Sequence, residues 1–145
     1  MTSRRLGEWA VILGGVLCII GTLGSWSSVP GFGDIEFVNR NERWLVLAAG
    51  CVLVVVGVLA AIPVLRDRWP RVVTVIVVWG AALVVGLCFI DTAKKIDSVE
   101  VFPGGHLEGH VGWGLWTATG GAVIALVGLL GELVERRAEL ETDAP

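Results

Sequence analysis

Both histidines of the chain fall in one short segment, and its residues are the best suited to chemistry. His106, Glu108 and His110 alternate along the string HLEGH. In an extended segment these three side chains would point to the same face, and imidazole and carboxylate groups are ligands for zinc or copper. The spacing makes metal binding by this segment a hypothesis. The favoured interpretation is a solvated loop, because glycines surround the segment and no cysteine lies near it.

The composition indicates what must position that segment. The 145 residues are 54% hydrophobic and only 17% charged, and the mean hydropathy is +0.77. This is too apolar for a soluble domain of this length, so the excess apolar side chains must face lipid. Four stretches contain no charged residue: 9–33, 44–65, 72–90 and 111–131.

Each uncharged stretch is long enough to cross a bilayer as a helix, which takes about 20 apolar residues. Inside lipid the backbone must pair its own polar groups, and this favours helix even in valine-rich runs. We therefore predict an all-α membrane protein, a single four-transmembrane-helix bundle spanning residues 1–145. The expected spans are 7–27, 44–65, 71–90 and 112–133, with outer loops at 28–43 and 91–111 and a cytoplasmic tail at 134–145.

The two expected outer loops share a string, which suggests two tandem helical hairpins. Residues 30–36 read PGFGDIE and residues 103–108 read PGGHLE, and a tryptophan follows eight residues after each glutamate. The alternative is that turns, interfacial tryptophans and packing glycines occur in any small membrane hairpin. Alternating acidic and apolar residues at 34–38 and 99–101 predict short strands that pair into a small outer sheet.

Small residues recur every four positions on the first and last expected spans. Gly14 and Cys18 lie on one such ridge, and Gly121 and Ala125 on the other. Because lipid offers no hydrophobic drive for helix association, close approach over small side chains holds such bundles together. We expect these two spans to pack against each other.

Six of the seven tryptophans lie near the ends of the expected spans, where an amphipathic ring prefers the headgroup boundary. We predict that these six are interfacial anchors: Trp9, Trp26, Trp44, Trp69, Trp113 and Trp116.

Arginine and lysine are distributed unevenly between the two sides. Seven fall with the termini and the 66–71 turn, and four fall in the outer loops. The positive-inside rule then places both termini in the cytoplasm of a multi-pass plasma-membrane protein. Nucleic-acid binding has no support, because the basic residues are few and dispersed.

The uncharged stretches also lack histidine, asparagine and glutamine, so no ion path marks a coupled transporter. The three cysteines all lie within spans, and no cofactor motif is present. These features favour a non-enzymatic protein without a cofactor. Its partners would be the lipid bilayer and a protein partner or further copies of itself.

Residues 26–33 and 112–121 resemble the corresponding segments of small four-span membrane proteins of high-GC Gram-positive bacteria and their phages. The resemblance implies a plasma-membrane location and no particular activity. The leading hypothesis is an accessory or structural subunit of a bacterial envelope complex, or a homo-oligomer. The alternative is a phage-derived superinfection-exclusion or lysis-related protein, and a weaker alternative is an extracytoplasmic metal-binding module.

The charge distribution generates a test of topology. A cysteine introduced as Ser98→Cys lies in the second outer loop, whereas the native cysteines lie in spans. We expect a membrane-impermeant maleimide to label it in intact cells. Labelling only after lysis would invert the orientation.

Overall fold

A computed structural model describes residues 3–28, 40–62, 71–97, 100–102, 105–106 and 110–142. It contains four long helices: α1 (Ser3–Leu23), α2 (Arg40–Ala61), α4 (Arg71–Asp97) and α5 (Trp113–Thr142). All four are long and apolar enough to cross a membrane. The predicted all-α architecture of four transmembrane helices is confirmed.

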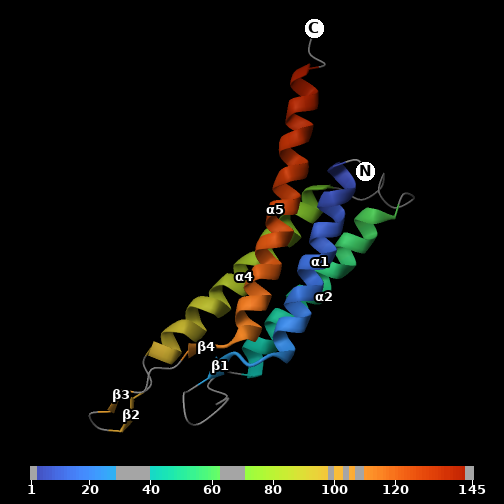
Figure 1. Cartoon of the computed structure of the whole chain (residues 1–145). Coiled ribbons are helices and arrows are strands. Elements are labelled where there is room, and N and C mark those ends of the chain that lie inside the picture. The colour runs from blue at the N-terminus through green and yellow to red at the C-terminus, as the bar shows by residue number, and fades with distance from the viewer. Residues whose placement is uncertain are drawn as a thin grey trace.

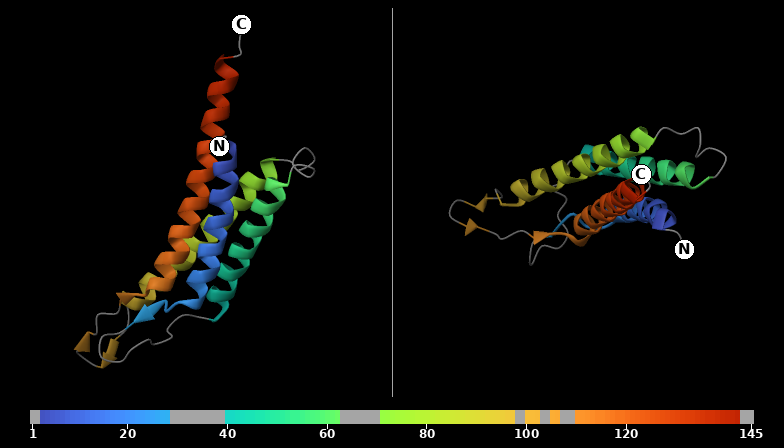
Figure 2. Two further views of the ribbon diagram at one scale, coloured as in Figure 1. Left: turned by 45° about the vertical axis from the view of Figure 1, so that its right-hand side comes forward. Right: turned by 90° about the horizontal axis from the view of Figure 1, so that it is seen from above.

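The helices form a closed ring in which consecutive helices are neighbours. α1 packs against α2 and α5, and α4 contacts α2 and α5 on the other side. Figure 2 shows α1 and α5 side by side, with α2 and α4 forming the second layer. Buried side chains such as Cys18, Leu53, Val85 and Leu115 fill the space between the layers.

The two ends of the bundle differ. The chain termini lie at one end, which we call the terminal end, and the short strands lie at the other, the strand end (Figure 1). α5 continues past the other helices at the terminal end. Its 30 residues extend about 45 Å at 1.5 Å per residue, which exceeds the ~30 Å hydrocarbon core.

Four short strands pair at the strand end. β1 (Ser27–Ser28) pairs antiparallel with β4 (His110–Val111), and β2 (Glu100–Phe102) pairs antiparallel with β3 (Gly105–His106). The predicted strand at 99–101 corresponds to β2, but its partner is β3. The other predicted strand, at 34–38, lies outside the described residues.

At the strand end, the helices begin and end at other residues than the predicted spans. α1 ends at Leu23, not at residue 27, and α2 already begins at Arg40. α4 continues through Asp97, so the expected loop at 91–111 begins with a further helical segment. The third span was predicted to end before Asp91, whereas the backbone of α4 stays helical there because Asp91 and Lys95 find charged partners. Helix α5 likewise includes most of the expected tail.

Small residues bring α1 and α5 together along their length. A Cβ placed on Gly14 would lie 2.8 Å from the Cβ of Ala125, and one on Gly121 would lie 2.5 Å from the carbonyl oxygen of Gly14. These distances are shorter than van der Waals contact, so the two backbones touch. The Cys18 Sγ donates a hydrogen bond to the Ala118 carbonyl, 3.3 Å away on α5.

α2 meets α1 in a similar way. A Cβ on Gly15 would lie 2.8 Å from the Gly50 carbonyl oxygen, and one on Gly57 would lie 2.6 Å from Ile12 Cγ1. α1 therefore has close glycine contacts on two faces and is the central helix of the packing.

The two helical hairpins do not pack alike. In a symmetric tandem repeat, the glycines of α5 would face α4, as those of α2 face α1. Instead Gly121 and Gly128 both face α1. On α4, a Cβ at Gly80 or Gly86 would meet no described atom within 4 Å. The two outer loops share a sequence string, but the helices that follow them do not make equivalent contacts.

The α1–α5 contact predicts which glycines tolerate enlargement. Gly14→Leu and Gly121→Leu force a side chain against backbone and should each cost at least about 1–3 kcal/mol. Gly120→Leu is the matched control on α5, where a Cβ would meet no described atom within 4 Å, and it should stay within about 0.5 kcal/mol of the unsubstituted protein. Unfolding in detergent, followed by circular dichroism, measures the difference. Equal stability of the Gly14 and Gly120 variants would contradict this packing.

Candidate functional site

Several specific polar contacts lie at the strand end, which is built around the segment that follows α1. The Trp26 Nε1 donates to the Gly21 carbonyl at the end of α1, at 2.9 Å. The same carbonyl also accepts from the Gly24 N–H at 3.3 Å. The Trp26 ring is fully buried, and the Arg43 guanidinium carbon lies 5.8 Å from the ring centroid. The indole therefore joins the end of α1 to the start of α2.

Backbone contacts tie the same segment to the start of α5. The Gly112 N–H donates to the Trp26 carbonyl at 2.8 Å, and the Gly114 N–H donates to the Ser25 carbonyl at 2.9 Å. A Cβ on Gly114 would lie 2.6 Å from the Gly21 carbonyl oxygen. Only glycine permits this approach, so the chain entering α5 lies directly on the end of α1.

A polar cluster connects α2 to α4 beside this junction. The Glu42 carboxylate forms an ion pair with Lys95 Nζ and accepts a hydrogen bond from Thr92 Oγ1 at 3.4 Å. Lys95 also pairs with Asp91 at 2.5 Å, one helical turn earlier. Thr92 is buried, and the Glu42 side chain is only 13% exposed.

Helix electrostatics favour the same arrangement. Glu42 lies in the first turn of α2, and Lys94 and Lys95 lie in the last turn of α4. The first turn of a helix carries partial positive charge and the last turn partial negative charge, so each side chain complements its own helix. The Glu42 carboxylate pairs with the Lys95 ammonium and accepts from the Thr92 hydroxyl. We call this cluster the polar clamp, because it links α2 to α4.

The predicted metal ligands are not brought together on one strand. His106 lies in β3 and His110 in β4, and these strands pair with different partners. Glu108 lies outside the described residues. Among the described residues, no group of three or more His, Cys, Asp and Glu side chains could hold a metal ion. The continuous extended segment that motivated the metal hypothesis is therefore absent from the described part, and the hypothesis itself stays a prediction.

The predicted anchors fall into three groups. Trp9, Trp44, Trp113 and Trp116 are each more than half exposed on the helix surface, as a lipid-facing ring would be. Trp116 also packs edge-to-face on Phe89, with centroids 5.2 Å apart. Trp69 lies outside the described residues. Trp26 differs from the prediction: it is a core residue, because its ring is fully buried beside Arg43 of α2 rather than facing the surface.

The structure brings together the four predicted packing residues. Gly14, Cys18, Gly121 and Ala125 all lie in the α1–α5 contact.

The sequence predictions missed the Glu42–Lys95 clamp, because both residues lay in expected loops. The i,i+4 pair of Asp91 and Lys95 was the available signal that α4 continues past residue 90.

These elements define the class of the molecule, a four-helix multi-pass membrane protein whose strand end is held by a polar clamp. Comparison of the chain with protein-family models, with curated proteins and with solved structures found no match.

The clamp predicts unequal effects of two conservative substitutions. Glu42→Gln removes the charge that joins α2 to α4 and should lower the free energy of unfolding by about 1 kcal/mol. Asp91→Asn removes an exposed charge but leaves the Glu42–Lys95 ion pair between the helices in place, so it should have a smaller effect. Unfolding of both variants in the same detergent measures this. A larger loss for Asp91→Asn would show that the clamp does not hold the two helices.

Proposed function

We propose that this chain is a non-enzymatic protein of the bacterial plasma membrane that acts by packing against another transmembrane helix. It serves either as an accessory subunit of an envelope complex or as a homo-oligomer, and both termini are cytoplasmic. The observation that carries the proposal is the open face of α4, which comprises Ile76, Gly80, Leu83 and Leu87. All four residues are exposed.

Gly80 is the informative residue of this face. Glycine inside a helix costs roughly 0.5–1 kcal/mol relative to alanine, and in membrane helices that cost is offset where another backbone approaches closely. Gly14, Gly50 and Gly121 have such partners within the chain. A Cβ on Gly80 would meet none of the described atoms within 4 Å, and α4, unlike α5, makes no close glycine contact with any described helix. We therefore infer that the helix that matches Gly80 comes from another molecule.

The packing of α4 supports the same choice of face. α1 has close glycine contacts with both of its neighbours, whereas both glycines of α4 point into open space. The described contacts of α4 are carried by side chains, including the Glu42–Lys95 clamp and the Phe89–Trp116 ring contact. The backbone of α4 therefore remains accessible to a further helix.

Disulfide crosslinking in native membranes tests the proposal. The background replaces Cys18, Cys51 and Cys88 by alanine, and Gly80→Cys is compared with Gly120→Cys. Both glycines are exposed with open space around them, but Gly120 lies on α5. A homo-oligomer predicts a covalent dimer from Gly80→Cys at several times the yield from Gly120→Cys.

The accessory-subunit form predicts a different product. Gly80→Cys would then give little homodimer, and a bifunctional thiol crosslinker would join it to one specific membrane protein that Gly120→Cys does not capture. If neither product forms and the purified protein is a monomer without a partner, the proposal is wrong.

A further inference from the structure

The open face of α4 carries charges of both signs at its strand end. Asp91 and Lys94 follow Leu87 along the same side of the helix, one and two turns later, and all three residues are exposed. Because Asp91 and Lys94 are three residues apart, they are neighbours on the helix surface. The apolar face therefore ends in a carboxylate beside an ammonium group.

Asp91 can accept a further hydrogen bond although it already pairs with Lys95. That ion pair uses Oδ2 of the carboxylate, and an ionised carboxylate has two oxygens with roughly four acceptor sites. The Asp91 side chain is also 54% exposed. A group that approaches the open face can thus reach Asp91 without displacing Lys95.

The two lysines lie on opposite sides of Asp91 around the helix. At 3.6 residues per turn, Lys94 is rotated about 60° from Asp91 in one direction and Lys95 about 40° in the other. Lys95 reaches Glu42 of α2, so Asp91 lies on the side of the open face next to α2, and Lys94 lies farther from α2. Lys95 belongs to the polar clamp, whereas Lys94 belongs to the open face.

A second copy of this chain supplies the matching charges. Identical chains have the same orientation in the membrane, so a two-fold axis along the membrane normal relates two parallel α4 helices. This axis sets the α2 side of one face against the far side of the other. Each contact then occurs twice. Asp91 of one copy meets Lys94 of the other, and Lys94 of the first meets Asp91 of the second.

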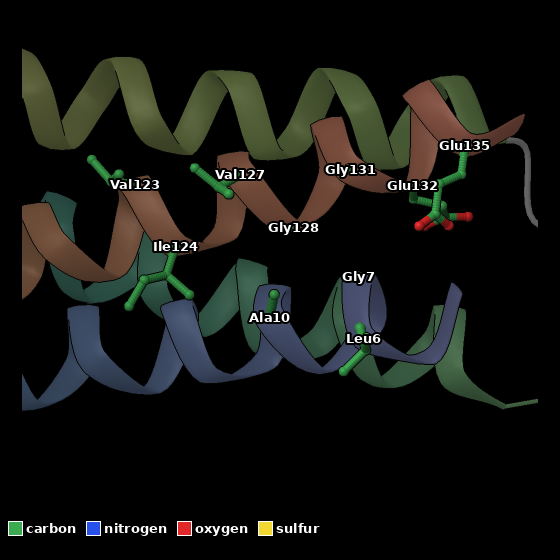
Figure 3. Close-up of a pocket in the computed structure, with 10 residues that line it drawn as sticks. All are labelled: Leu6, Gly7, Ala10, Val123, Ile124, Val127, Gly128, Gly131, Glu132 and Glu135. Atoms are coloured by element: carbon green, nitrogen blue, oxygen red, sulfur yellow. The ribbon is translucent and has the colours of Figure 1, made fainter. Parts of the chain in front are cut away.

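Another surface of the molecule lacks this pattern of charge. An aliphatic groove lies between α1 and α5 near the terminal end (Figure 3). Its charged lining residues are Glu132 and Glu135, and Figure 3 shows their carboxylates at the same end of the groove. Both have the same sign, so a two-fold contact there would bring like charges together. The charges of the lining therefore favour the open face of α4 for a second copy.

We propose that the open face of α4 binds α4 of a second copy, in a parallel two-fold dimer with reciprocal ion pairs between Asp91 and Lys94. This pairing rests on the proposed function, since it names the partner of the same face. Gly80 lets the two backbones approach each other. Leu83 and Leu87 pack against the other copy between Gly80 and the ion pairs.

Charge reversal in the full-length protein tests the pairing. In a homodimer, Asp91→Lys sets lysine against lysine at both contacts, and Lys94→Asp sets aspartate against aspartate. Each variant should associate with itself at least about fivefold more weakly than the unsubstituted protein, because two attractive pairs become repulsive. Copies with two different C-terminal tags are co-expressed. Purification in detergent through one tag, followed by quantification of the other, measures the association.

A mixture of the two variants separates this pairing from a general loss of stability. Co-expressed Asp91→Lys and Lys94→Asp chains have opposite charges at both contacts, so their association should return to near the unsubstituted level. Any disturbance within one copy is still present in the mixture, so recovery reports a contact between copies. Glu135→Lys is the control, since Glu135 is exposed but lies outside the open face, and it should not change the association.

The outcomes distinguish the dimer from the proposed function. Recovery in the mixture alone supports the reciprocal pairing. Equal association of all variants, or no recovery in the mixture, overturns it. If Gly80→Cys gives no homodimer and crosslinks to one other membrane protein, this pairing is wrong and the proposed function stands. If neither product forms, both are wrong.

Discussion

The direct contact between the backbones of α1 and α5 is the constraint on which the rest of the structure depends. In a bilayer, apolar side chains gain little by leaving lipid for a neighbouring helix, so close packing of atoms must supply the attraction. Gly14 and Gly121 allow that packing because neither has a side chain to separate the helices. α2 packs with Gly50 and Gly57 against the second face of α1. The bundle is therefore organised around its first helix, and α4 is held mainly by side chains.

At the strand end the chain leaves the helices, and the polar groups of the helix ends need hydrogen-bond or ion-pair partners. Trp26 provides one for α1 by donating to the Gly21 carbonyl, and its ring is buried. At the ends of α2 and α4, Glu42 and Lys95 are each other's charged partners. Apolar packing thus gives way to hydrogen bonds and ion pairs where the span ends. The same change occurs at the terminal end, where the aliphatic groove meets Glu132 and Glu135.

The sequence was sufficient to predict the helix number, the class of fold and the α1–α5 interface, because each rests on a local signal. An uncharged run of sufficient length specifies a span, and small residues every four positions specify a packing ridge. The helix ends could not be found in this way. Asp91 and Lys95 are charged yet helical, since their i,i+4 pairing and the contact with Glu42 stabilise the extra turns. The burial of Trp26 could not be predicted from the local sequence either. The segment of Trp26 is held by hydrogen bonds from Gly112 and Gly114, which are far away in the sequence. The groove was hidden for the same reason, since it forms only when two distant helices meet.

The central place of α1 has a consequence for how the protein is made. Cys18 and Ala118, which are hydrogen-bonded across the α1–α5 contact, are 100 residues apart in the chain. Ribosomes add about 5–20 residues per second, so α1 leaves the ribosome about 5–20 s before the helix that it packs against most closely. During that interval α2 can cover one glycine face of α1, while the face containing Gly14 and Gly21 has no partner from its own chain. Assembly of the bundle is therefore completed only when the last helix enters the membrane, and a chain that stops before α5 leaves the most adhesive surface of the molecule exposed to its neighbours.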